Sequence, residues 1–233
     1  MRFKEFILNA IFPSRCVCCG QVLKIGDKVC DSCKTNLKYT TNRVCRGCGL
    51  DFTECACRQI GRQFEGVCAP FEYTNSGRKL VFRYKFKKDK VAAKFASEHM
   101  VRSVFTTFRD VKYDLITYVP MKKSAERERG VNQALVLAKL ISKATQIPLS
   151  ETLKQTGDKK TQHELPASLR VQNVAGVFSA TNNLSGKTVL LIDDICTTGA
   201  TLNECTRVLK NAGAKAVYCC VTARTHYKNF DAE

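Results

Sequence analysis

Long apolar runs and histidine are scarce in this sequence. The chain of 233 residues has no apolar stretch near the roughly 18 residues that a membrane-spanning helix requires. The N-terminal stretch MRFKEFILNAIFPSRC is broken by Lys4, Glu5 and Asn9, and no small-residue cleavage site follows, so we do not expect a signal peptide. We therefore expect a cytoplasmic location, where a reducing environment makes paired cysteines an indication of metal rather than of disulfides.

Acidic residues are also few. The chain has 21 Asp and Glu against 38 Lys and Arg, which leaves a net charge of +17 and favours nucleic acid or phosphorylated small molecules as partners. No glycine-lysine loop of the Walker type is present, which argues against an ATPase. Internal repeats and low-complexity linkers are absent as well. A hydrophobic content of 44% is enough for one full-sized core and a smaller module.

Cysteine, in contrast, is abundant, and most of the fourteen cysteines lie in the first quarter of the chain. The closely spaced pairs are Cys16 and Cys19, Cys30 and Cys33, Cys45 and Cys48, and Cys55 and Cys57. Two such pairs can surround one tetrahedral ion, so four pairs predict two Zn²⁺ sites, a double zinc ribbon over residues 1–60. The first site is the clearer prediction, because Cys55 and Cys57 are only two positions apart. Cys18 could compete for the first ion.

We expect these zinc ions to be structural. About 60 residues with few large aliphatic side chains cannot fold on core burial alone, and a site of four thiolates leaves no position for a catalytic water. The remaining cysteines have no ligand spacing and are expected to be small core residues: Cys68, Cys196, Cys205, Cys219 and Cys220.

The rest of the chain, residues 61–233, alternates between strand and helix patterns. Strands are expected at 67–73, 114–120, 148–155, 186–193 and 214–225, and helices at 94–108, 131–146 and 200–213. This alternation predicts an α/β domain with a mostly parallel sheet flanked by helices. The polar segment 156–176 is long for a loop in a compact domain, and its place before a strand suggests a lid over a ligand.

The stretch VLLIDDICTTGAT joins the end of an apolar strand to the start of a helix. Ligands of open α/β sheets bind at the carboxyl ends of strands, where Asp193 and Asp194 are expected to lie. Two neighbouring carboxylates suit the two hydroxyls of a ribose. The turn that follows offers hydroxyls, a glycine that permits close approach and free amides at the helix start, all of which suit a phosphate. The stretch therefore predicts a pocket for a ribose 5-phosphate.

Several motifs resemble known families. DDICTTGAT is similar to the phosphoribosyl pyrophosphate (PRPP) motif of type I phosphoribosyltransferases. RERGVNQA, TQHELPASLRVQNVAGVF, LVFRYKFKKDK and FPSRCVCCG resemble segments of the ComF family of bacterial competence proteins, and together the likeness covers nearly the whole chain. The departures are Val131 in place of a phenylalanine, Cys196 at a usually aliphatic position, and the short Cys55-x-Cys57 pair.

This resemblance implies a role for each matching residue. Asp193 and Asp194 would contact the ribose hydroxyls, while Thr197, Thr198, Gly199, Ala200 and Thr201 would surround the 5-phosphate. The pyrophosphate, bridged by Mg²⁺, would lie near Met121 and Lys122, beside the signature residues Arg127, Arg129 and Asn132. Thr161, Gln162 and Arg170 would belong to the lid. The alternative for the two arginines is a solvated helix start.

Two functions follow from the resemblance. One is an adapter for incoming single-stranded DNA in natural transformation, acting with a helicase and a recombination mediator. The other is a transferase that moves ribose 5-phosphate from PRPP to a nucleobase or amine, with any cover over the sugar coming from the zinc module and the segment up to about residue 112. A third possibility is another nucleic-acid or metabolic role in an organism that takes up no DNA.

A basic segment, residues 78–94, is the candidate DNA contact. It interleaves cations with aromatics, and the predicted contacts are Arg83, Tyr84, Lys85, Lys87 and Lys88. The cations could follow phosphates while the aromatics stack on bases. Alternatively, the aromatics face the core and the lysines are merely solvated.

Overall fold

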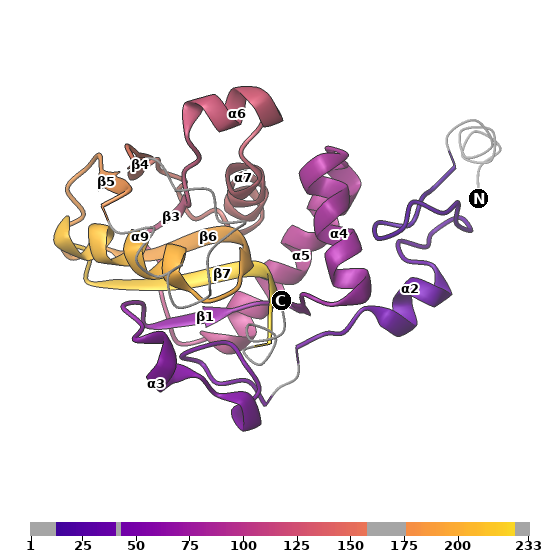
Figure 1. Cartoon of the computed structure of the whole chain (residues 1–233), viewed down its shortest axis with the longest axis horizontal. Helices are drawn as coiled ribbons and strands as arrows, with labels where there is room; N and C mark the ends of the chain where they lie inside the picture. Colours follow the sequence, from indigo (N-terminus) through magenta and orange to yellow (C-terminus); the bar gives the residue numbers. More distant parts are fainter. Residues whose placement is uncertain (1–12, 41–42, 158–175, 227–233) are drawn as a thin grey trace.

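A parallel β-sheet lies at the centre of the computed structural model, which describes residues 13–40, 43–157 and 176–226 (Figure 1). The strand order is β1-β7-β6-β3, with β2 also paired to β7. The five strands are β1 (Gly66–Cys68), β2 (Phe71–Glu72), β3 (Leu115–Tyr118), β6 (Thr188–Cys196) and β7 (Ala216–Arg224). A separate antiparallel pair consists of β4 (Leu153–Gln155) and β5 (Phe178–Ala180). The predicted α/β class is confirmed.

Helices occur where the sequence predicts them and in several further places. Those of the α/β part are α4 (Asn75–Phe86), α5 (Lys90–Thr107), α6 (Lys123–Arg129), α7 (Gln133–Thr145) and α9 (Ala200–Asn211). The cysteine-rich part contains α2 (Asp31–Asn36), the 3₁₀ turn η1 (Phe52–Glu54) and α3 (Cys57–Ile60). Strand β5, helices α4 and α6, and the helices of the cysteine-rich part are additions to the predicted elements. Among the described helices, none is both long and apolar enough to cross a membrane.

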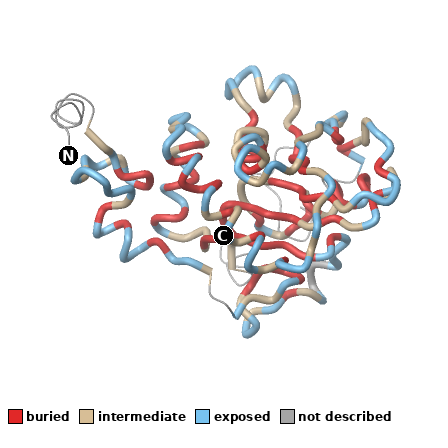
Figure 2. The backbone as a smooth tube through the Cα atoms, turned by 180° about the vertical axis from the view of Figure 1, so that it is seen from behind, coloured by how far each residue is buried: buried red, intermediate tan, exposed pale blue. Residues whose placement is uncertain are grey.

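The strand β6 shows how the core is divided. Val189 and Leu191 pack on the side of α9, while Leu190 and Ile192 pack on the side of α5 and α7. Successive side chains of a strand point to opposite faces, so an unbroken apolar run is buried on both sides of the sheet (Figure 2). The run ends at Asp193, which places polar groups at the carboxyl edge.

The cysteine-rich region is divided between two places in the molecule. Its first part, residues 13–40, lies beside α4, and its second part, 43–60, lies beside β1 (Figure 1). The first part shares the large core with α4, whereas the second has a small cluster of its own around Leu50. The predicted domain boundary at residue 60 stays a prediction.

Candidate functional site

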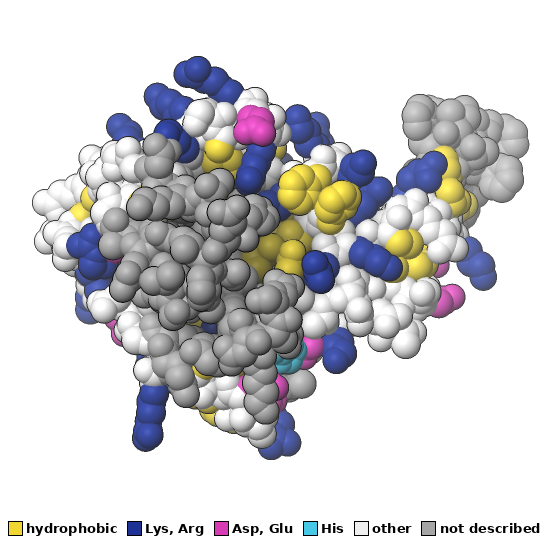
Figure 3. Space-filling model, in the orientation of Figure 1, with side chains coloured by type: hydrophobic (Ala, Val, Ile, Leu, Met, Phe, Trp, Pro, Cys, Tyr) yellow, Lys and Arg dark blue, Asp and Glu magenta, His cyan; other side chains and the backbone are white. Residues whose placement is uncertain are grey.

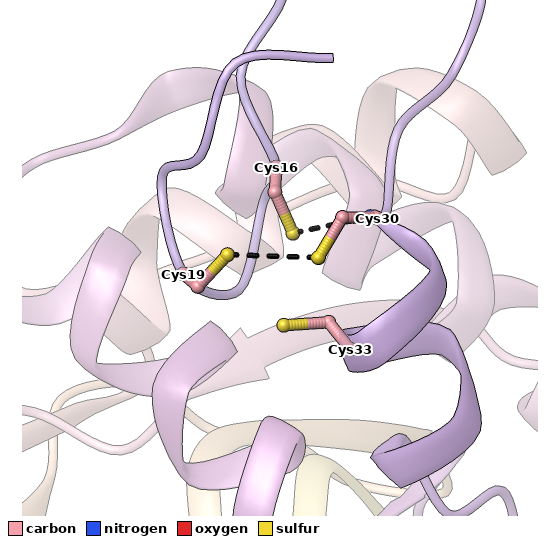
Figure 4. A group of neighbouring side chains, drawn as sticks. All are labelled: Cys16, Cys19, Cys30 and Cys33. Atoms are coloured by element: carbon pink, nitrogen blue, oxygen red, sulfur yellow. Dashed lines mark hydrogen bonds between the residues drawn. The ribbon is translucent and has the colours of Figure 1, made fainter. Parts of the chain in front are cut away.

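The first cysteine cluster consists of Cys16, Cys19, Cys30 and Cys33, whose sulfurs all lie within 4.8 Å of one another (Figure 4). The first two come from a tight turn, and the other two from the start of α2. The Sγ atoms of Cys19 and Cys30 are 3.7 Å apart. Burial raises the pKa of Cys16, but backbone amides more than offset this and lower the pKa to about 6, which favours a thiolate.

The second cluster, Cys45, Cys48, Cys55 and Cys57, is equally compact, with all four sulfurs within 4.8 Å of one another. The Sγ atoms of Cys45 and Cys57 are 3.5 Å apart, and those of Cys48 and Cys55 are 3.8 Å apart. The short spacing is accommodated because η1 ends just before Cys55 and α3 begins at Cys57. The ligand set predicted from the spacing is brought together in full.

Both clusters fit a structural Zn²⁺, because four thiolates at this spacing match the tetrahedral closed sites that zinc prefers. Cys18 is not one of the four cysteines whose sulfurs gather in the first cluster, and its side chain is buried in the core. The five cysteines without ligand spacing are buried as expected: Cys68, Cys196, Cys205, Cys219 and Cys220.

The loop between β6 and α9 encloses a cavity of about 140 Å³. Its lining includes Asp193 and the five predicted phosphate residues, Thr197, Thr198, Gly199, Ala200 and Thr201. Gly199 is the residue before α9 and has φ of +84°, a conformation that favours glycine. The amide of Ala200 donates to the hydroxyl of Thr198 at 3.2 Å. A helix N-terminus at a polar cavity is suited to an anion.

Helix α4 meets the two carboxylates at the edge of β6. Lys85 donates from Nζ to Oδ2 of Asp194, and both side chains are mostly buried. The backbone carbonyl of Lys85 also accepts a hydrogen bond of 3.0 Å from Gln133 at the start of α7. A lysine predicted to contact DNA is therefore paired with a carboxylate predicted to contact the ribose.

Two other residues predicted to contact DNA, Tyr84 and Arg83, bond to side chains of the protein itself. Tyr84 is only 4% exposed, and its hydroxyl donates to Thr222 at 3.1 Å, so the prediction of base stacking by Tyr84 is wrong. Its position follows from the helical period, which places it one turn after the buried Leu80. Arg83 forms an ion pair with Asp89. Lys87 and Lys88 are exposed.

The RERG segment lies at the end of α6, next to the turn that follows α4. Arg127 and Arg129 are exposed on the last turn, and a Cβ added at Gly130 would lie 2.6 Å from Nζ of Lys88. Met121 and Lys122 are half-buried just before α6. The two segments therefore bring cations from different parts of the sequence to one place.

The side chain of Asn132 is buried and bonds to the backbone at the start of α7. Its Oδ1 accepts from the amide of Ala134 at 3.0 Å, which caps α7. Its Nδ2 donates to the carbonyl of Val119 at 3.1 Å. Both ends of its amide thus bond to the backbone, and the prediction that Asn132 lies at the pyrophosphate stays a prediction. The lid residues Thr161, Gln162 and Arg170 lie outside the described residues.

Arg224 is a site residue that the motifs do not include. It is the last residue of β7, and it donates from Nη1 to the carbonyls of Cys196 and Thr197, at 3.2 and 2.5 Å. These carbonyls belong to the loop around the predicted phosphate cavity. An arginine at the carboxyl end of an otherwise apolar strand is the signal by which the sequence could have revealed it.

His226 links the second cysteine cluster to the sheet, with Nδ1 2.6 Å from Glu54 and Nε2 3.0 Å from Glu72. Burial lowers the pKa of His226, but the two carboxylates outweigh it and raise the pKa above its ordinary value. The stabilisation is fully present below the pKa of the unfolded histidine and is lost as the pH rises through the folded pKa. We expect this link to weaken over that range.

An NMR titration of the His226 ring measures the effect. The double variant Glu54→Gln/Glu72→Gln should lower the pKa of His226, because burial then acts without opposing charges. A pKa that is the same in both proteins would contradict the link.

Known proteins resemble the chain over most of its length. A model of the double zinc ribbon domain matches residues 7–71, and one of the phosphoribosyl transferase domain matches 131–231. Competence protein ComFC of Bacillus subtilis is 31% identical over 84% of this chain and 83% of its own. DNA utilization protein YhgH of Escherichia coli is 27% identical over 91% of this chain and 98% of its own.

Among solved structures, a purine phosphoribosyltransferase from Pyrococcus horikoshii aligns with 57% of this chain and 84% of its own, at 17% identity and a TM-score of 0.35. The parallel sheet, the two cysteine clusters and the matched domains together identify a type I phosphoribosyltransferase fold preceded by a double zinc ribbon. With the identity to ComFC over most of both chains, they show that this chain belongs to the ComF family.

Proposed function

We propose that the carboxyl edge of β6 binds the ribose 5-phosphate part of PRPP. The observation that carries this proposal is the set of groups that line one cavity, namely the carboxylate of Asp193, a threonine-rich loop and the N-terminus of α9, with Asp194 next to Asp193 on β6. Asp193 and Asp194 suit the ribose hydroxyls as acceptors. The loop amides and the dipole of α9 suit the 5-phosphate, which needs donors and positive potential.

The pyrophosphate of PRPP would lie toward α6, where Arg127, Arg129 and Lys88 can supply positive charge. Mg²⁺ that arrives with PRPP would neutralise part of the pyrophosphate charge. Lys85 would hold the carboxylate of Asp194 in place for the ribose, because the two side chains form an ion pair. Met121 and Lys122 stay proposed neighbours of the pyrophosphate, and the lid residues stay proposed as well.

We infer a role in handling DNA that enters the cell. The support is that two relatives are named a competence protein and a DNA utilization protein. The net charge of +17 suits a polyanion. A cytoplasmic location, a helicase and a recombination mediator as partners, and single-stranded DNA as ligand belong to the same proposal.

A groove of about 600 Å³ between the first cysteine cluster and α4 is the proposed path for the strand. Phe82 and Phe86 line it and are 49% and 56% exposed, with ring centroids 5.1 Å apart. Lys79 and Lys87 also line it, and Nζ of Lys87 lies 5.9 Å from the ring centre of Phe82. Figure 3 shows hydrophobic side chains beside Lys and Arg over α4. Exposed rings can stack on bases while the cations follow phosphates.

Charge reversal on this groove tests the DNA contact. We expect Lys79→Glu/Lys87→Glu to weaken binding of a labelled oligo-dT at least about tenfold and to flatten its salt dependence, because phosphate contacts release counterions. Fluorescence anisotropy over a range of salt concentrations measures both effects. The matched control is Arg102→Glu/Arg109→Glu, which makes the same charge change in a separate groove along α5. Equal or greater loss in the control would contradict the α4 path.

Calorimetric titration of Mg²⁺-PRPP into the zinc-loaded protein tests the phosphosugar site, and we expect micromolar binding. Absence of binding would contradict the proposal.

An active transferase is the second candidate, because the α4 groove reaches Ile195, directly after the two acids, where a flat acceptor could lie. Release of pyrophosphate from PRPP with one of a panel of nucleobases would establish transferase activity. Binding of PRPP without release would mean that the site binds the ligand and does not turn it over.

A further inference from the structure

Arg224 joins two sites that are far apart in the sequence. The side chain is 2% exposed, and its Nε donates to the carbonyl of Cys48, a ligand residue of the second cysteine cluster, at 2.8 Å. On its other side, Nη1 donates to the carbonyls of Cys196 and Thr197 in the phosphate loop, and lies 2.7 Å from the sulfur of Cys196. One guanidinium thus holds both segments.

The contacts of Arg224 determine the orientation of the loop peptides. The peptide bonds of the described residues are all trans, so each amide N–H points away from the carbonyl of the same peptide unit. When Arg224 holds the carbonyls of Cys196 and Thr197, the amides of Thr197 and Thr198 therefore point away from Arg224. Arg224 does not line the phosphate cavity. It binds the loop on the side opposite the cavity, so the amides of Thr197 and Thr198 stay available to a ligand.

Arg224 also carries a positive charge that has no carboxylate partner among the described residues. Its hydrogen-bond acceptors are carbonyls and a sulfur. A buried cation without a counter-charge is costly, and an anion bound nearby reduces that cost. Within the described part of the chain Arg224 has no counter-charge, and an anion in the phosphate cavity would supply one in addition to its bonds with the loop amides.

We infer that Arg224 couples metal binding at the second cysteine cluster to anion binding at the phosphate loop. A metal fixes Cys48, Cys48 fixes Arg224, and Arg224 fixes the two loop carbonyls. Coupling between two binding sites is reciprocal, so a ligand in the loop tightens binding of the second metal by the same factor by which the metal tightens binding of the ligand. The ligand part of this inference rests on the proposed phosphosugar function, whereas the structural part does not. Arg224 is a positioning residue.

The first test needs no ligand. Amide hydrogen exchange at residues 197–201 should speed up at least about fivefold in Arg224→Met, which removes every donor but keeps an unbranched side chain. The same change is expected in Cys57→Ser, which opens the second cluster without touching the loop. Arg46→Met is the control, because this exposed arginine lies in the second cluster region and contacts Asp110 instead. Unchanged exchange in both test variants would overturn the inference, and Cys57→Ser decides if Arg224→Met does not fold.

The second test measures the coupling itself. A chromogenic chelator should remove zinc from the second cluster of the wild-type protein at least about threefold more slowly when Mg²⁺-PRPP is present. The kinetic phase of this cluster is the one that disappears in Cys57→Ser. In Arg224→Met the slowing should vanish, and Arg224→Lys should restore only part of it, because an ammonium cannot span both segments. Binding of PRPP with no effect on zinc release would overturn the coupling. If PRPP does not bind, the proposed function fails and the exchange test alone decides.

Discussion

Replacing Cys16 and Cys33 with serine is expected to unfold the region around α4 as well as the first zinc site. Both cysteines belong to the same buried cluster as Leu80 and Tyr84 of α4. Structural Zn²⁺ contributes on the order of 10 kcal/mol of binding free energy, which is comparable to the whole stability of a domain. The loss of one metal site therefore removes an essential part of the core. Zinc content and thermal unfolding followed by circular dichroism measure the effect.

The matched control is Cys45→Ser/Cys57→Ser in the second cluster. This cluster packs in a small group of its own, with Cys48, Leu50 and Ala56. We expect this variant to lose one zinc per chain and to retain most of the helical circular dichroism signal and a cooperative unfolding transition. If the first-cluster variant unfolded at the same temperature as the wild type, its cysteines would contribute little to the core.

Asp193→Asn is expected to weaken binding of Mg²⁺-PRPP by about 10- to 100-fold. Hydrogen bonds to a charged group contribute about 1.5–3 kcal/mol, and an amide keeps the shape of the carboxylate while losing its charge. Asp193 is the acid that lines the cavity. Its partner Asp194 forms the ion pair with Lys85, so Asp194→Asn would leave a mostly buried ammonium without its counter-charge.

Isothermal titration calorimetry measures the affinity, with the unfolding temperature recorded for each variant. The paired variant Lys85→Gln/Asp194→Asn serves as the control for the second acid, because it removes both charges together. We expect it to unfold at a higher temperature than Asp194→Asn alone. Unchanged affinity in Asp193→Asn would mean that this carboxylate does not contact the ligand.

Helix α4 shows why part of the site could not be read from the motifs. The basic segment has a helical period, so Leu80 and Tyr84 lie on one face and Phe82 and Phe86 on the other. The sequence alone left open which aromatics face the core. The answer depends on what packs against the helix, namely the sheet with Thr222 and the first cysteine cluster.

The sequence by itself determined the local features of this protein. The cysteine spacing predicted both four-sulfur clusters, the apolar runs predicted the buried parallel strands, and DDICTTGAT predicted the loop before α9. Each of these depends on residues that are close together in the chain. Only the tertiary structure decided that Lys85 meets Asp194, 109 positions away, and that Arg224 meets Cys48, 176 positions away. Such contacts depend on how separate elements pack, because a charged side chain in a partly buried place bonds with whichever group the fold brings within reach.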